Sequence, residues 1–329
     1  MLIRGRSAPL LRRGHAAEGG HLLGRAAALL VVLLAACAPL SAQPTDGEAS
    51  RPLRIVATTG IVADLVRNIG GERVEVTALM GPGVDPHLYR PTAGDVRRLE
   101  TADALFYHGL ELEGRMSDLF ARLARSGRPT FAVTAEVPRA LLRPAAEVEG
   151  AFDPHLWHDV ALWRIVAKTV ARQLSTLDPG AAELYARNHA AYDAQLEELD
   201  RYVAAQAATL PPRSRVLVTA HDAFGYFGAR YGFEVRALQG ISTVTEASAA
   251  DVRELAGFLC ERGVKAVFLE TTVAPATIEA VRRAAMANGC LVTLGGSLYS
   301  DALGGAETPA STYIGMVRAN IDTIVRALQ

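Results

Sequence analysis

Short apolar, β-branched runs alternate with stretches of helical periodicity along most of this 329-residue chain, and this alternation constrains its fold more than any other feature. Strands of this length that alternate with helices favour a parallel βαβ sheet covered on both faces. In the first half the expected strands are LRIVATT (53–59), RVEVTALM (73–80), ADALFYHG (102–109) and TFAVTAE (130–136). The expected helices between them are 61–69 and 114–127.

The middle of the chain has a different pattern. Residues 159–210 are almost wholly helical in character and are broken at Asp178-Pro179-Gly180. In the longer piece, 181–210, apolar residues recur three or four apart along one stripe. A helix of that length spans about 45 Å at 1.5 Å per residue, which is more than a small lobe needs, and Pro211-Pro212 ends it.

The strand–helix alternation then returns in the second half. The expected strands are 215–221, 233–238, 266–271 and 290–296, and the expected helices are 248–262, 275–288 and 310–328. We therefore expect an α/β protein of two lobes, each with a mostly parallel four-stranded sheet flanked by helices, joined by one long backbone helix. The expected boundaries are an N-terminal lobe 53–178, a linking helix 179–210 and a C-terminal lobe 211–329.

The N-terminus resembles an export signal. Five arginines precede an apolar run of eleven residues, Ala26–Ala36, which is too short to span a bilayer but suits a signal peptide. The run ends in Leu34-Ala35-Ala36-Cys37, which looks like a lipobox, so we expect residues 1–36 to be removed and Cys37 to be lipid-modified. Simple cleavage after Ala42 and an uncleaved anchor are the alternatives. With 37–52 as a tether, the protein is expected to be extracytoplasmic, in the periplasm or at the cell surface.

The charge balance excludes several functions. The chain carries a formal net charge of −1, and removing five Arg and one Glu with residues 1–36 leaves about −5, so nucleic-acid binding is not supported. After Cys37 no apolar stretch has the length of a membrane span, and no P-loop motif occurs. The chain is therefore expected to be neither a permease nor a P-loop ATPase.

Two further cysteines, Cys260 and Cys290, lie in an expected helix and at the start of an expected strand. An oxidising compartment allows a disulfide between them. Two separate buried thiols are the simpler expectation.

One short pattern occurs twice, as DPHLY (85–89) and DPHLW (153–157). Proline after Asp85 and Asp153 favours extended backbone at these aspartates, so His87 and His155 are expected on loops. Both copies lie in the first half, which excludes a repeated lobe as the explanation. A shared structural turn and a shared ligand site remain as alternatives, and the aromatic residue and histidine common to both favour the ligand site.

The second half offers two more candidate ligands, each after an expected strand. His221 ends VLVTAH, and Asp301 lies in the glycine-rich loop of LGGSLYSDALGG. Ligands of doubly wound sheets bind outside the carboxyl ends of the strands. Two lobes that face each other across these ends would bring both residues together with His87 and His155.

Three imidazoles and one carboxylate complete a coordination shell for one divalent first-row ion, and Zn²⁺ or Mn²⁺ is expected at this site. Glu270, at the end of AVFLET, is expected to accept an imidazole N–H and so fix its tautomer. His108 and His158 are neighbours of the site rather than expected ligands.

The chain resembles the TroA-like solute-binding proteins of metal ABC importers, also called cluster A-I, over nearly all of residues 53–329. The matching segments are DPHLY (85–89), YHGLELEGRM (107–116), DPHLW (153–157), TAHDAFGYFG (219–228), LQGIST (238–243) and GGSLYSDALG (295–304). The resemblance implies two α/β lobes joined by a rigid helix, with a metal ion between them. It implies the same four ligands, His87, His155, His221 and Asp301.

Departures from the family pattern bear on the metal. Many manganese binders of the family have Glu at the position of His221, and zinc specialists commonly carry a His-rich loop that 141–155 lacks. The His/His/His/Asp set is similar to members that accept both ions, and the Irving–Williams order favours zinc on this shell.

We therefore expect a monomeric, non-enzymatic capture protein that delivers Mn²⁺ or Zn²⁺ to a separate permease and its ATPase. An exported metallohydrolase using the same residues is one alternative, although catalytic zinc normally keeps an open position. A binder of chelated metal or another small solute is the other.

Overall fold

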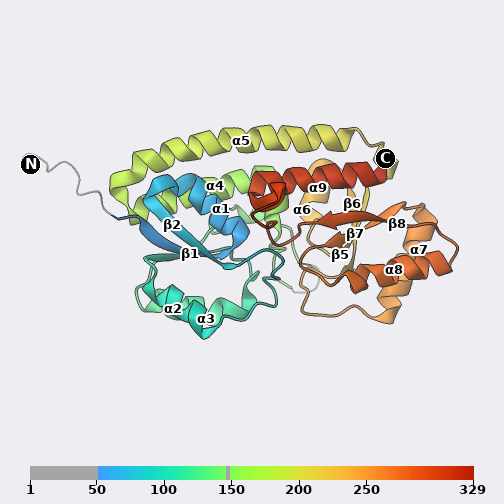
Figure 1. Cartoon of the computed structure of the whole chain (residues 1–329), viewed down its shortest axis with the longest axis horizontal. Coiled ribbons are helices and arrows are strands. Elements are labelled where there is room, and N and C mark those ends of the chain that lie inside the picture. The colour runs from blue at the N-terminus through green and yellow to red at the C-terminus, as the bar shows by residue number, and fades with distance from the viewer. Residues whose placement is uncertain (1–50, 146–148) are drawn as a thin grey trace, which may run out of the picture. The chain divides into compact units, whose positions relative to one another are not determined.

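The computed structural model describes residues 51–145 and 149–329 (Figure 1). These residues belong to one compact unit, Arg51–Gln329. The expected signal peptide, Cys37 and nearly all of the expected tether lie outside the described residues, so they stay predictions.

The first half is built on a four-stranded parallel sheet. Its strands are β1 (Leu53–Thr59), β2 (Val74–Met80), β3 (Ala104–Tyr107) and β4 (Thr130–Ala132), in the order β2-β1-β3-β4. All three pairings are parallel. The four strands expected from the apolar runs are thus present, with β3 and β4 shorter than expected.

Helices cover both faces of this sheet. They are α1 (Gly60–Gly70), α2 (Ala93–Thr101), α3 (Ser117–Arg125) and α4 (Val160–Leu177). Figure 1 shows α1 and α4 on one side of the sheet and α2 and α3 on the other. α2 has no counterpart among the expected helices, because its first turn is set by a polar capping box that Thr92 and Asp95 form rather than by an apolar stripe.

The alternation of side chains along β1 explains why two helical layers are needed. Ile55 and Ala57 belong to the core shared with α1 and α4, whereas Val56 lies in a separate core with residues of α2 and α3. A strand that is apolar on both faces must be covered on both.

The long helix α5 (Ala182–Ala208) follows α4, as the pattern predicts, and its bounds lie within two residues of the helical piece 181–210. At 1.5 Å per residue its 27 residues span about 40 Å. It runs along both halves of the described unit, with α9 (Tyr313–Leu328) beside it (Figure 1). Its buried stripe consists of Tyr185, Tyr192, Leu196, Leu199, Val203 and Ala207.

The second half has four strands in two parallel pairs. β5 (Val216–His221) pairs with β6 (Glu234–Gln239), and β7 (Ala266–Glu270) pairs with β8 (Thr293–Leu298). β5 and β7 lie side by side, but the hydrogen-bonded ladder is not continuous between the pairs. The expected four-stranded sheet is therefore divided here, while the α/β class with parallel strands is confirmed.

Short and long helices complete the second half. They are α6 (Gly225–Tyr231), α7 (Ala249–Arg262) and α8 (Pro275–Ala287), besides α9. Alternation again divides the core: Leu217 faces the core shared with α9, and Val216 and Val218 face the core shared with α7 and α8. The larger core is continuous from the first half to the second, and the division into lobes at 178/179 and 210/211 stays a prediction.

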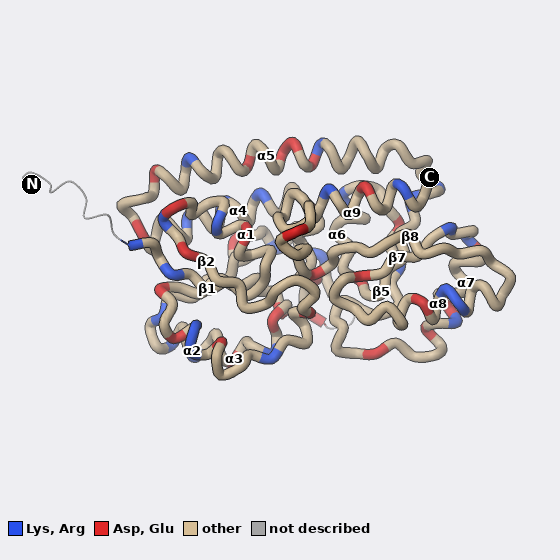
Figure 2. The backbone as a smooth tube through the Cα atoms, in the orientation of Figure 1, with Lys and Arg blue, Asp and Glu red and all other residues tan. Residues whose placement is uncertain are grey.

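Among the described helices, none is long and apolar enough to cross a membrane. Figure 2 shows basic and acidic residues intermixed on both halves of the described unit.

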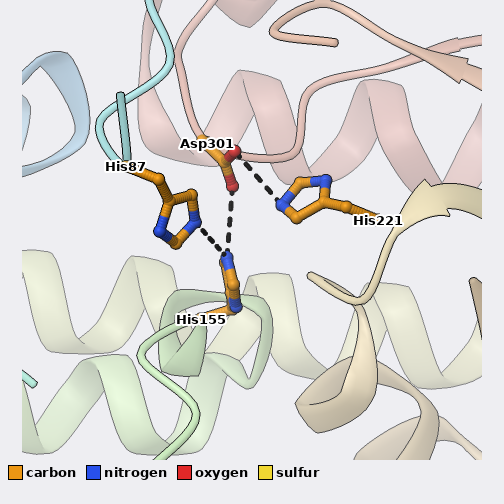
Figure 3. Close-up of side chains that lie close together, drawn as sticks. All are labelled: His87, His155, His221 and Asp301. Carbon is orange, nitrogen blue, oxygen red and sulfur yellow. Dashed lines mark hydrogen bonds and ion pairs between the residues drawn. The ribbon is translucent and has the colours of Figure 1, made fainter. Parts of the chain in front are cut away.

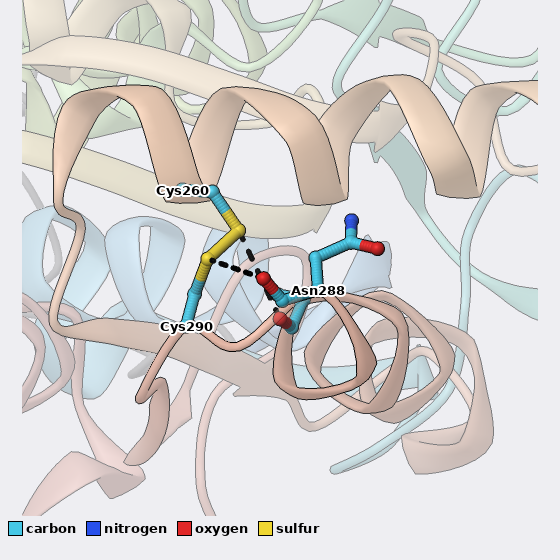
Figure 4. The surroundings of a disulfide bond; sticks show 4 residues. Cys260, Asn288 and Cys290 are labelled. Atoms are coloured by element: carbon cyan, nitrogen blue, oxygen red, sulfur yellow. Dashed lines mark hydrogen bonds between the residues drawn. A yellow bond between two sulfur atoms is a disulfide. The ribbon is translucent and has the colours of Figure 1, made fainter.

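Cys260 and Cys290 form a disulfide, so the expectation of two separate thiols is wrong (Figure 4). Cys260 lies in the last turn of α7 and Cys290 follows the turn after α8, and these helices pack against each other. The two Cα atoms are 5.5 Å apart, which is within the usual range for a bridge. Sequence spacing alone cannot show this proximity.

Candidate metal centre

The four candidate ligands lie at the ends of strands or helices that face one another. His87 is on the turn after β2, and His155 immediately precedes the short helix η4 (Leu156–His158) that leads into α4. His221 is the last residue of β5, and Asp301 lies in the loop after β8. Three of them therefore follow parallel strands at their carboxyl ends, where α/β proteins place ligands.

The four side chains converge on one buried point (Figure 3). One ligand atom from each residue lies within 4.8 Å of the others. The Nε2 atoms of His87 and His155 are 3.2 Å apart, and the Asp301 carboxylate lies 3.5 Å from His155 Nε2 and 3.2 Å from His221 Nε2. Each half of the chain contributes two of the four groups.

Two of the imidazoles are oriented by carboxylates on their far side. His155 Nδ1 is 2.8 Å from Asp153 Oδ1, and His221 Nδ1 is 2.5 Å from Glu270 Oε2. Glu270 also accepts the backbone N–H groups of Ala220 and His221. In a neutral ring, a proton held at Nδ1 by such a partner leaves the Nε2 lone pair directed into the cluster, as a metal-binding imidazole requires, and His221 reaches this state when it loses its second proton.

Burial keeps two of the imidazoles neutral at physiological pH. It lowers the pKa of His87 to about 4 and that of His155 to about 3. For His221, burial also acts to lower the pKa, but the charges of Glu270 and Asp301 outweigh it and raise the pKa well above its usual value.

The carboxylate of Asp301 is ionised. Burial acts to raise its pKa, but the surrounding histidines, His221 first, bring the pKa well below its ordinary range. Asp301 Oδ1 and His221 Nε2 are buried and make no well-aligned hydrogen bond in the described protein, so their polar contacts are the ion pairs within the cluster, Asp301 Oδ1 with His155 Nε2 and His221 Nε2 with Asp301 Oδ2. Buried polar atoms are normally satisfied, so a directed ring of such atoms fits a cation at its centre.

His108 and His158 are buried beside the cluster but point elsewhere. The Nε2 atom of His108 lies 2.7 Å from the carbonyl oxygen of Pro154, next to His155. The Nε2 atom of His158 lies 2.9 Å from the carbonyl oxygen of Ser300, next to Asp301. These rings thus support the backbone that carries two candidate ligands, and they are not among the four converging residues.

Sequence reasoning missed the two aspartates of the repeated motif as functional residues. Asp85 Oδ1 accepts the backbone N–H of His87 at 2.8 Å, and Asp153 Oδ1 accepts that of His155 at 2.9 Å. The signal was available, since aspartate commonly accepts a hydrogen bond from the backbone two residues on. Which partner the second carboxylate oxygen meets could not be predicted from the sequence.

Comparison with known proteins identifies the family. The sequence profile of the family described as zinc-uptake complex component A, periplasmic, matches residues 55–327. The zinc-binding protein TroA of Treponema pallidum is 49% identical over 278 residues, covering 84% of this chain and 89% of TroA. The manganese-binding lipoprotein MntA of Bacillus subtilis is 43% identical over 304 residues, covering 92% of this chain and 99% of MntA.

A third relative and a solved structure agree with this. The manganese ABC transporter substrate-binding lipoprotein PsaA of Streptococcus mitis is 29% identical over 305 residues, covering 91% of this chain and 96% of PsaA. The solved structure of the periplasmic zinc-binding protein TroA from Treponema pallidum superposes with a TM-score of 0.82 at 48% identity, covering 84% of this chain and 99% of that chain.

Proposed function

We propose, from the premise that this chain belongs to the zinc-uptake complex component A family, that it is the extracytoplasmic solute-binding component of a metal ABC importer. It captures one Zn²⁺ or Mn²⁺ ion and delivers it to a separate permease driven by its ATPase. Relatives named as zinc-binding, manganese-binding and ABC transporter substrate-binding proteins support this proposal.

One observation carries the proposal: two pairs of buried donors, one pair from each half of the chain, meet at a single point. We assign His87, His155, His221 and Asp301 as the ligands, with the imidazole Nε2 atoms and the carboxylate oxygens as donors. The ion's two positive charges and the one negative charge of Asp301 leave a net charge of +1 in a buried site. This residual charge is smaller than that of the bare ion and suits a buried site.

The donor set accepts both ions. Zn²⁺ takes three imidazoles and one carboxylate oxygen in a tetrahedral arrangement, and Mn²⁺ tolerates both carboxylate oxygens of Asp301 as a fifth position. By the Irving–Williams order, this donor set binds Zn²⁺ more tightly than Mn²⁺. The ion carried in the cell therefore follows its availability as well as its affinity.

A complete set of four protein ligands also distinguishes this site from a catalytic zinc site. Catalytic zinc sites keep a position for water beside three protein ligands. Glu270 is the candidate general base of a hydrolase, but its carboxylate already accepts hydrogen bonds from His221 and from two backbone N–H groups. The geometry therefore favours capture of an ion over hydrolysis.

We propose in addition that Cys37 carries a lipid anchor that holds the protein at the membrane surface. The lipobox-like Leu34-Ala35-Ala36-Cys37 and the lipoprotein names of two relatives support this. Mass spectrometry of the mature N-terminus tests it: a diacylated Cys37 is expected, and an N-terminus at Gln43 would exclude it.

Calorimetry with His87→Ala and Asp301→Ala tests the site. Each variant is expected to lose tight one-to-one binding of Zn²⁺, because an incomplete shell leaves the remaining buried donors poorly arranged. His189→Ala, on α5 outside the cluster, is the matched control and is expected to bind like the unaltered protein. Unaltered binding by both ligand variants would reject the assignment.

A further inference from the structure

The segment that carries His87 is joined to the second half through one threonine. Thr243 donates its hydroxyl hydrogen to Asp85 Oδ2 at 2.6 Å, across 158 residues of sequence. The other carboxylate oxygen of Asp85 accepts the backbone N–H of His87. One carboxylate therefore links the second half directly to the backbone of a proposed ligand.

The backbone of His87 is held at its other end as well. Its carbonyl oxygen accepts a hydrogen bond from Arg115 Nε at 3.3 Å. Arg115 belongs to the first half, whereas Thr243 belongs to the loop after β6. Of these two contacts to the backbone of His87, only the one through Asp85 involves a residue of the second half.

Open space flanks this junction. A cavity of about 560 Å³ is lined by His87 and by residues 238–242 and 245–247. A second cavity of about 380 Å³ is lined by Asp85, Leu88 and Thr243 among others. Neither cavity is enclosed by basic residues, and carboxylates of Glu111, Glu246 and Asp251 line the first.

Thr243 itself is shielded, while its surroundings are exposed. Its side chain is 8% exposed, whereas neighbouring Val244 is 54% exposed and Leu88, beside His87, is 43% exposed. A sheltered hydroxyl that bonds a carboxylate is a strong contact, because charge-assisted hydrogen bonds are short and are weakened less when water is kept away.

From these contacts we infer that Thr243 is a positioning residue: through Asp85 it fixes the backbone of His87 when the halves meet, and so sets how long the captured ion is retained. This inference rests on the proposed function. Thr243 does not contact the ion, so its loss should leave the four donors and the one-to-one stoichiometry unchanged. The rate of ion release should rise, since affinity changes of this kind appear mainly in dissociation.

Stopped-flow release of Zn²⁺ from the full-length protein into excess fluorescent chelator tests this inference. Thr243→Val keeps the shape and removes the hydroxyl, and we expect release to be about 10-fold faster, which is the lower end of what one hydrogen bond to a charged group contributes. Thr243→Ser restores the hydroxyl and should restore slow release. Thr245→Val, the same change two positions away on the same loop, is the matched control and should release at the unaltered rate.

A double-mutant cycle shows whether Thr243 acts through Asp85. In an Asp85→Ala background, Thr243→Val should cause no further acceleration, because the acceptor is already missing. The melting temperatures of the ion-free variants are measured beside the rates to identify a general loss of folding. If Thr243→Val is destabilised, the release rate of Thr243→Ser is compared with that of the unaltered protein instead.

The outcomes separate the two proposals. If the unaltered protein fails to bind one Zn²⁺ ion, the proposed function fails. If it binds the ion but Thr243→Val releases it at the unaltered rate, or Thr245→Val accelerates release equally, the role of Thr243 is overturned and the metal site stands.

Discussion

In both Asp-Pro-His segments the aspartate accepts the backbone N–H of the histidine two residues on, at 2.8 Å for Asp85 and 2.9 Å for Asp153. The repeated sequence therefore encodes a repeated turn. The second partners differ: Asp85 meets Thr243 of the second half, whereas Asp153 meets the ring of its own His155. The turn is therefore shown, and it is compatible with the ligand site that we propose.

The surroundings of the two segments differ more than their turns. Beside His155, Trp157 donates its ring N–H to the carbonyl oxygen of Ser300, and Tyr226 of the second half donates its hydroxyl to the carbonyl oxygen of Asp153. Tyr313 adds a third contact from the second half, to the carbonyl oxygen of Trp157. The larger cavity is lined by both segments, through His87 and Pro154, whereas the smaller one is lined by Asp85 and Leu88 of the His87 segment and not by the His155 segment. Both imidazoles are buried, but that of His155 is held by several contacts from the second half, whereas that of His87 lies beside a cavity that its own segment lines.

The largest expected effects are those of replacing the two histidines, and the two variants should differ in their free energy of unfolding. His87→Ala and His155→Ala should both abolish tight Zn²⁺ binding in calorimetry. Only His155→Ala should also lower the free energy of unfolding of the ion-free protein, by about 1–3 kcal/mol, because the buried Asp153 loses a hydrogen-bond partner. Urea denaturation measures this free energy, and equal stabilities of the two variants would contradict the expected difference between the two segments.

The next effect concerns the aspartates. Asp153→Asn should weaken Zn²⁺ binding by about 10- to 100-fold, since a partner that orients a ligand imidazole contributes that much. Asp85→Asn should weaken it less, because Asp85 acts on the backbone of His87 rather than on its ring. Competition titration with a chelator of known affinity gives both values, and the reverse order would contradict the assignment of roles.

The dependence on pH should come from His221 in the second half and from Asp153 beside His155, since burial raises the pKa of Asp153 to about 7. Burial lowers the pKa of His87 to about 4 and of His155 to about 3, so both are already neutral above pH 5. His221 has a raised pKa in the ion-free protein, so an incoming ion must displace its proton.

Affinity should therefore rise with pH, by up to about tenfold per pH unit, while His221 remains protonated in the ion-free protein. Calorimetry at pH 7 in buffers of different ionisation enthalpy should show at least one proton released per ion, from His221 and in part from Asp153. Release of no proton would show that His221 is already neutral. Glu270→Gln, which removes the charge beside His221, should reduce the number released.

The smallest expected effect on binding comes from the disulfide. Cys260 and Cys290 close a loop with a sequence separation of 30, and opening it should cost about 3–4 kcal/mol in the chain-entropy treatment. Reduction should therefore lower the melting temperature by several degrees and leave Zn²⁺ affinity unchanged, because the bridge joins α7 to the residues before β8, away from both segments. A change in affinity would show that the second half transmits strain to the site.

Much of the fold could be predicted because its signals are local. The apolar run 53–59 coincides with β1, and the Pro211-Pro212 pair ends α5 within a few residues of the expected position. The capping box of α2 and the division between the β5–β6 and β7–β8 pairs were not predicted, since the first depends on two polar residues and the second on strand twist and packing.

The four candidate ligands and the role of Glu270 could be predicted from the sequence, but the contacts that join distant residues without a shared motif could not. His87, His155, His221 and Asp301 each follow a recognisable local pattern, and parallel strands bring their ends together. The contact of Glu270 with His221 follows from the same arrangement. The bond from Thr243 to Asp85 and the bridge of Cys260 to Cys290 join distant residues without a shared motif, so only the folded chain shows them.

Crystals of the protein grown with Zn²⁺ and measured at the zinc absorption edge test the central claim most directly. One anomalous peak is predicted between the two halves, about 2.0–2.2 Å from the Nε2 atoms of His87, His155 and His221 and from a carboxylate oxygen of Asp301. A peak at another position, or a zinc ion there that lacks His87 or Asp301 and carries water instead, would contradict the account.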